Sequence, residues 1–79
     1  MFFLALALMM PQVTGLDLPA ATDRLREAGI EQVAAVPLDG GFVVTRRDWV
    51  VCTQSPADGD PYTGGTVTLG VIEKRKGCP

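Results

Sequence analysis

The sequence predicts an α+β fold in which one α-helix packs on a small β-sheet of three or four strands. One stretch of helical periodicity occurs, at residues 17–29. Short runs of β-branched and aromatic residues follow it, separated by prolines and glycines, as is typical of strands and turns. This order indicates a helix layered on a small antiparallel or mixed sheet.

The helix is expected to begin after Asp17 and to end at Gly29. Asp17 is a natural N-cap, and Pro19 is tolerated in the first turn, where its missing amide hydrogen costs no hydrogen bond. Gly29 is expected just past the C-cap, with Ile30 folding back onto the last turn. One apolar face is formed by residues at helical spacing, Leu18, Ala21, Leu25 and Ala28.

The first strand is predicted at residues 32–36 and is ended by Pro37. The sequence Asp39-Gly40-Gly41 then predicts a turn. Residues 42–44 form either a short strand or one side of a long loop.

Two further strands are predicted after this loop. Residues 49–53 favour a pleated strand, which must stop at Pro56 because proline has no amide hydrogen to donate. Turns at residues 58–59 and 64–65 follow. The alternation of residues 67–72 then indicates a closing strand.

Length and composition restrict the possible functions. The chain has 79 residues, 47% of them hydrophobic, which predicts one small domain with a limited core. Its net charge of −2 provides no general attraction to nucleic acid. There is no histidine, and Ser55 has no visible activating partner, so an enzyme is not expected. No cofactor or metal is expected either, because two cysteines alone do not make a zinc site and Asp58-Gly59-Asp60 lacks the other ligands of a calcium loop.

The two cysteines, Cys52 and Cys78, allow only one pairing. A bridge between them would anchor the chain end to the sheet and contribute roughly 3–4 kcal/mol for a loop of about 25 residues in the chain-entropy model. A lasting disulfide implies an oxidising compartment. The alternative is two unrelated thiols, with Cys52 a small buried hydrophobe.

Residues 1–9 form an uncharged apolar run that is too short to span a bilayer and has no basic residues before it. Three interpretations stay open: a truncated signal or anchor, an added strand, or a hydrophobic tail for self-association. The single domain is therefore expected at residues 10–79.

Several short motifs together resemble a PASTA domain. Residues 54–59 (Gln-Ser-Pro-Ala-Asp-Gly), followed by residues 65–69 (Gly-Thr-Val-Thr-Leu), resemble its second half. Residues 10–16 resemble its entry segment, and its helix pattern is matched by Ala21, Leu25, Ala28 and Gly29. The resemblance covers about residues 10–72. It implies one helix against three strands, in a bacterial module that lies outside the cell and is associated with binding peptidoglycan fragments.

The details of the resemblance bear on function. Single-copy PASTA-like modules of actinobacterial secreted or lipoprotein-like type are similar in their Cys-Pro ending, whereas residues 38–48 are a longer insertion than is typical. The expected function is an extracytoplasmic, non-catalytic module, secreted or associated with the cell envelope, that contacts peptidoglycan fragments or another envelope protein. The alternative is a structural or protein–protein interaction module with no small-molecule ligand. Membrane contact is expected only through an N-terminal anchor, and the sequence does not determine the oligomeric state.

Four residues are candidate ligand contacts. Two guanidinium groups, on Arg46 and Arg47, lie beside the Trp49 indole in sequence, and together they suit a carboxylate and a sugar ring. The alternative is that Trp49 anchors the core and the arginines are solvated. Tyr62 is either a second stacking platform or a cover over the sheet edge. The short basic run at residues 73–76 is typical of a solvated face, although it also suits an anionic polymer or lipid.

Overall fold

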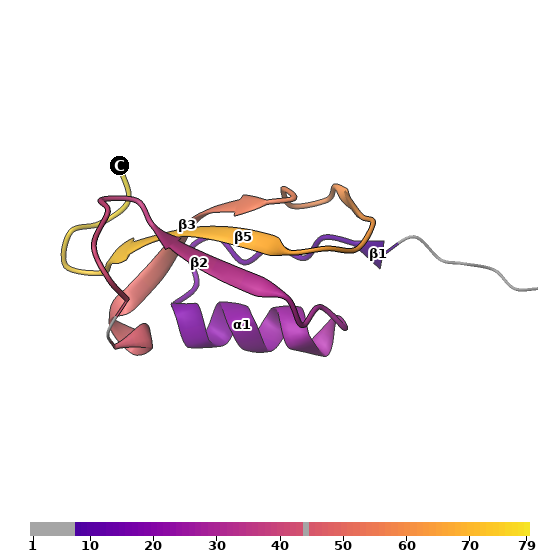
Figure 1. The fold of residues 1–79 in the computed structure, drawn as a ribbon, viewed down its shortest axis with the longest axis horizontal. Helices are drawn as coiled ribbons and strands as arrows, with labels where there is room; N and C mark the ends of the chain where they lie inside the picture. Colours follow the sequence, from indigo (N-terminus) through magenta and orange to yellow (C-terminus); the bar gives the residue numbers. More distant parts are fainter. Residues whose placement is uncertain (1–7, 44) are drawn as a thin grey trace, which may run out of the picture.

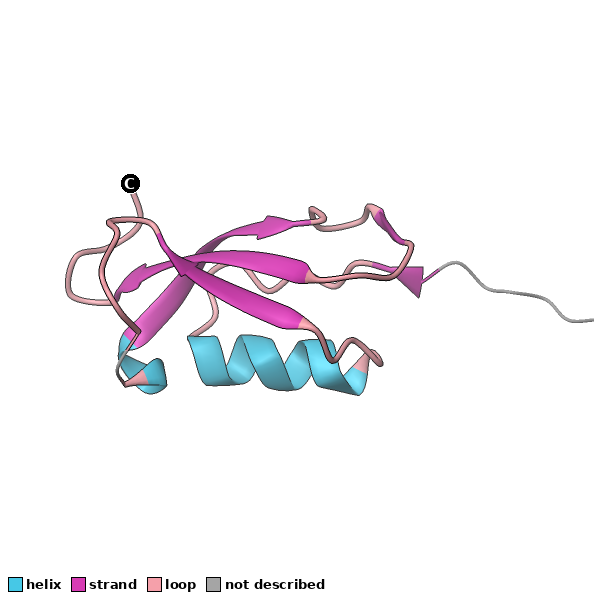
Figure 2. Cartoon of the chain, in the orientation of Figure 1, coloured by secondary structure: helices cyan, strands magenta, loops and turns pink. Residues whose placement is uncertain are grey.

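The computed structural model describes residues 8–43 and 45–79, and it confirms the α+β prediction. One helix lies along one face of a three-stranded sheet, and a separate two-stranded pair lies at one end (Figures 1 and 2). The elements are β1 (Leu8–Met9), α1 (Leu18–Glu27), β2 (Val33–Pro37), the 3₁₀ turn η1 (Arg46–Asp48), β3 (Trp49–Ser55), β4 (Pro61–Tyr62) and β5 (Val67–Glu73).

The larger sheet is mixed, with strand order β2-β5-β3. β2 runs parallel to β5, whereas β3 runs antiparallel to it. The core fills the space between α1 and the inner face of this sheet. Its buried hydrophobic residues are Met10, Val13, Leu18, Ala21, Leu25, Ile30, Trp49, Val51, Val67, Leu69 and Val71.

Both ends of α1 match the sequence prediction. The Ala20 amide donates to the Asp17 Oδ1 atom at 2.8 Å, so Asp17 caps the helix start. At the other end Gly29 has a φ of +89°, a left-handed conformation that favours glycine. The Ile30 amide then reaches back to the Leu25 carbonyl at 2.9 Å, and the Ile30 side chain is buried.

β3 contains a bulge at Cys52. Val51 pairs with Val71, but the next pair is Thr53 with Gly70, so Cys52 is the extra residue. One inserted residue reverses the alternation of inward and outward side chains along the strand. Gln54, rather than Thr53, therefore lies opposite the buried Leu69.

Gln54 uses this inward position to hold the entry segment. Its Oε1 atom accepts a hydrogen bond from the Val13 amide at 2.8 Å, and its Nε2 atom donates to the Pro11 carbonyl at 2.9 Å. A second donor contact from Nε2 reaches the Pro56 carbonyl at 3.2 Å. The side chain thus joins the exit of β3 to the start of the domain.

The apolar run enters the fold at Leu8 and Met9, which pair antiparallel with Tyr62 and Pro61. The next residue, Met10, is buried. The added-strand interpretation therefore describes Leu8 and Met9, and the rest of the run lies outside the described residues. Phe42 and Val43 lie in a loop, which is one of the two predicted alternatives for that stretch.

Candidate functional site

The sheet topology brings two charged segments together at one end of the molecule. Trp49 at the start of β3 pairs with Glu73 at the end of β5, and the Lys74 amide donates to the Asp48 carbonyl at 2.8 Å. η1 therefore lies beside the turn that follows β5. We call η1 and residues 73–76 the charged end. It holds five of the seven basic residues of the chain, Arg46, Arg47, Lys74, Arg75 and Lys76.

A cavity of about 310 Å³ lies at the charged end and is lined by Asp48, Glu73, Lys74 and Arg75. The lining thus consists of two acidic and two basic residues. Glu73 is half-buried, and the other three residues are exposed. Such a lining suits the binding of charged groups on a ligand.

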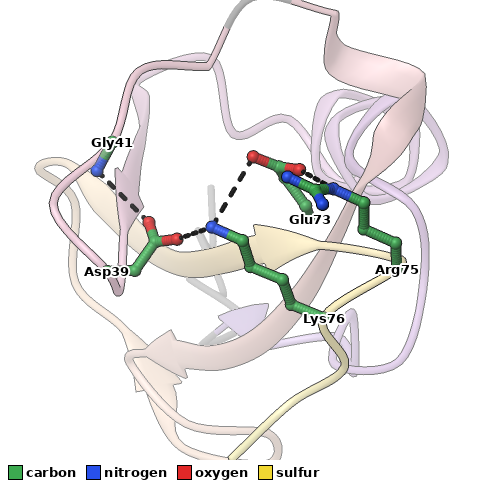
Figure 3. Close-up of polar contacts among 5 residues, drawn as sticks. All are labelled: Asp39, Gly41, Glu73, Arg75 and Lys76. Carbon is green, nitrogen blue, oxygen red and sulfur yellow. Dashed lines mark hydrogen bonds and ion pairs between the residues drawn. The ribbon is translucent and has the colours of Figure 1, made fainter.

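A network of ion pairs holds the turn that forms one wall of this cavity (Figure 3). Arg75 Nε donates to Glu73 Oε2 at 2.6 Å, and Lys76 Nζ lies 3.8 Å from Glu73 Oε1. Lys76 also pairs with Asp39 in the loop after β2, and the Gly41 amide donates to the same Asp39 carboxylate at 3.2 Å. Lys76 therefore connects the β2 loop to the turn after β5.

This network shifts two ionisation equilibria. The hydrogen bond from Lys76, followed by the one from the Gly41 amide, lowers the pKa of the Asp39 carboxyl. The Asp39 carboxylate in turn raises the pKa of the Lys76 ammonium. Each charge thus favours the charged form of its partner.

Two residues that line the cavity make at most a weak ion pair with other side chains of the described chain. Lys74 Nζ lies 3.9 Å from Asp17 Oδ2, the outer limit of an ion pair. Among the described residues, no side-chain hydrogen bond or ion pair involves the Asp48 carboxylate. One anion and one cation of the cavity are thus available to a ligand.

The structure does not bring the four residues that the sequence suggested as ligand contacts into one site. Arg46 Nη2 donates to the Thr22 hydroxyl at 2.8 Å, which ties η1 to α1, and Arg47 is exposed beside the cavity residue Asp48. Trp49 is only 3% exposed and lies in the core. The suggestion that its indole stacks on a ligand is therefore corrected: the core-anchor alternative describes its position.

Tyr62 lies far from these arginines. It belongs to β4, which pairs with β1, and Figure 1 places β1 at the opposite end of the fold from η1. The Tyr62 hydroxyl donates to the Gly65 carbonyl at 2.7 Å, and its half-buried ring packs against the core. This position agrees better with a cover over the sheet edge than with a stacking platform for a ligand.

The predicted disulfide between Cys52 and Cys78 is confirmed, with 5.6 Å between the two Cα atoms. Cys52 is the bulge residue of β3. Because it lies within this strand, the bridge fastens the chain end to the sheet, beside the charged end. The disulfide and the Lys76–Asp39 ion pair are two separate restraints on the turn after β5.

Asp48 lies within the 46–49 segment that the sequence suggested and Glu73 within the basic run, but neither was predicted as a ligand contact. The run at residues 73–76 was visible, but it is typical of a solvated face. Only the pairing of β3 with β5 places Asp48 next to this run.

No family model matches the chain, and no similar curated protein or solved structure was found. In the described part of the chain, no helix has the length and apolar character needed to cross a membrane.

Proposed function

We propose that this protein is an extracytoplasmic, non-catalytic binding module that contacts peptidoglycan fragments through its charged end. The observation that carries this proposal is the cavity lined by Asp48, Glu73, Lys74 and Arg75, with Arg47 next to Asp48 in the chain. Peptidoglycan stem peptides carry carboxylates and amino groups, which are the groups that such a lining attracts.

Two further observations support this proposal. A disulfide is typical of proteins in oxidising compartments, and Cys52–Cys78 therefore favours a location outside the cytoplasm, secreted or at the cell envelope. The resemblance of residues 10–72 to a PASTA domain favours the same location and the same ligand class.

Titration with soluble muropeptides, followed by amide chemical shifts, tests the proposal. Shift changes are expected at residues 46–48 and 73–76. Replacement of Arg47 by alanine should weaken binding about two- to fivefold, as is usual for an exposed charge pair. Arg26→Ala is the matched control, because this arginine is also exposed but lies in the last turn of α1, away from the charged end (Figure 1). Shift changes that are absent up to millimolar ligand would contradict the proposal.

A second candidate function is protein–protein interaction without a small ligand. It is favoured by exposed apolar side chains around the end of β2: Val36 is 48% exposed, Leu38 43% and Phe42 87%. Sedimentation of the full chain distinguishes the self-association form of this function, which predicts a concentration-dependent increase in mass. A strict monomer would count against it.

A further inference from the structure

We infer that the cavity at the charged end selects the zwitterionic end of an amino acid or short peptide, with an ammonium and a carboxylate group close together. This inference rests on the proposed function, because it names the part of a peptidoglycan fragment that the cavity recognises. It also disfavours a purely anionic polymer as the occupant of the cavity, because two of the four lining residues are acidic.

The first argument is the charge balance of the lining. Asp48 and Glu73 contribute two negative charges, and Lys74 and Arg75 contribute two positive charges. A polyanion would face two carboxylates and a polycation would face two cations, and like charges brought together across an interface oppose binding. A ligand that carries both charges meets complementary groups on both sides.

The second argument is that some of the lining charges already form ion pairs within the protein. Glu73 is held by Arg75 at 2.6 Å and by Lys76 at 3.8 Å, so its charge is largely neutralised within the turn. Asp48 and Lys74 remain, the first without a side-chain partner among the described residues and the second 3.9 Å from Asp17. We therefore assign the ligand ammonium to Asp48 and the ligand carboxylate to Lys74.

A backbone hydrogen bond fixes the relative positions of the Asp48 and Lys74 backbones. The Lys74 amide donates to the Asp48 carbonyl at 2.8 Å, so the two side chains start from hydrogen-bonded segments. The disulfide and the Lys76–Asp39 pair restrain the turn that carries Lys74. A pair of opposite charges carried by restrained backbone loses less backbone conformational entropy on binding than a pair carried by mobile backbone would.

The size of the cavity agrees with a small occupant. Its volume of about 310 Å³ lies at the lower end of the usual range for ligand sites. It therefore suits a group the size of one or two amino acids, and the sugar chain of a larger fragment would lie outside it.

Three simple probes test this inference by amide chemical-shift titration: the dipeptide alanyl-alanine, its N-acetyl form and its C-terminal amide. The unmodified dipeptide should shift residues 48 and 73–75 and bind most tightly. Each modification removes one charge and should weaken binding about two- to fivefold, as for an exposed charge pair. Equal affinity for all three probes, or shift changes confined to other surfaces, would overturn the inference.

Two variants test the assigned roles. In Asp48→Asn the unmodified and N-acetyl dipeptides should bind equally, because the ammonium has lost its partner. In Lys74→Gln the unmodified dipeptide and its amide should bind equally. Asp58→Asn, which changes an exposed aspartate in the turn before β4, should retain the wild-type preference. A preference that survives in both cavity variants would contradict the assignment.

The same titrations separate this inference from the proposed function. If muropeptides bind at the charged end but the charge modifications have no effect, the proposed function stands and the zwitterion inference fails. If the dipeptide binds with the expected preference but muropeptides do not bind, the inference about ligand chemistry stands and the peptidoglycan source is wrong. The comparison among the three probes uses the unaltered protein, so it does not depend on any variant folding.

Discussion

Gln54 is the residue whose side chain joins the most distant parts of the chain. It contacts the Val13 amide and the Pro11 carbonyl, which lie more than 40 positions earlier in the sequence. Both groups belong to the entry segment, where no strand ladder supplies alternative partners. A polar group that loses its partner in a partly buried position costs free energy. We therefore regard Gln54 as a structural residue.

Replacement of Gln54 by alanine should lower the free energy of unfolding by about 1–3 kcal/mol, because the Val13 amide would lose its acceptor. Urea unfolding measures this change. Gln32→Ala is the control, since Gln32 is exposed and its side chain has no hydrogen bond to a described residue. Equal losses in the two variants would show that the Gln54 hydrogen bonds contribute little to stability.

At the scale of elements, the two edge strands of the sheet are protected from pairing with other chains in different ways. The outer edge of β3 is covered by the entry segment, since the Gly15 amide donates to the Val51 carbonyl and the Val51 amide donates to the Leu16 carbonyl. β2 forms the other edge and ends in Pro37, which has no amide hydrogen to offer to a further strand. The sheet thus limits pairing with other chains at both edges.

The C-terminal tail is the element that depends most on a covalent bond. Residues 74–79 are all exposed, so the tail has little buried surface to hold it. A disulfide that closes a loop of this size stabilises by about 3–4 kcal/mol in the chain-entropy model. The double variant Cys52→Ser, Cys78→Ser should therefore unfold at a markedly lower urea concentration than the oxidised protein.

Dithiothreitol-treated wild-type protein serves as the control for the cysteine variants. Its urea midpoint should match that of the double serine variant, because both lack the same bond. Amide chemical shifts should also show that reduction changes residues 73–79 more than the core. A midpoint unaffected by reduction would mean that the tail is held by other contacts.

At the scale of the whole molecule, the ion pair between Lys76 and Asp39 connects the β2 loop to the C-terminal turn. The pKa of Asp39 is lowered in the folded protein, so its contribution to stability is complete above the unfolded value of about 3.9 and is lost as pH falls through the lower folded value. The pKa of Lys76 is raised, so its contribution is complete below about 10.4 and is lost as pH rises through the higher folded value.

Asp39→Asn should accordingly reduce the loss of stability between pH 5 and pH 2, roughly the window in which this carboxylate becomes protonated. The effect should be small, because both partners are solvent-accessible and the pair is screened by salt. Thermal unfolding at several pH values, at low and high ionic strength, measures it. Asp58→Asn is the control. The same acid dependence in both variants would exclude a role for the Lys76–Asp39 pair.

The parts of the fold that follow from neighbouring residues were predictable. Asp17 and Gly29 mark the helix ends because a capping carboxylate and a left-handed glycine act within one turn of the chain. Pro37 and the turn at residues 58–59 limit strands for equally local reasons. The partners of the disulfide were predictable because two cysteines allow only one pairing. The bulge at Cys52 was not, since it depends on the register between β3 and β5.

The candidate site shows the same division. The sequence by itself determined that Arg46, Arg47 and the run at residues 73–76 are charged and lie before or after the predicted strands. It could not decide that Trp49 lies in the core, or that Asp48 and Lys74 line the same cavity. Those facts were decided by the tertiary structure, because groups 25 or so residues apart meet only when strand pairing and core packing bring their backbones together.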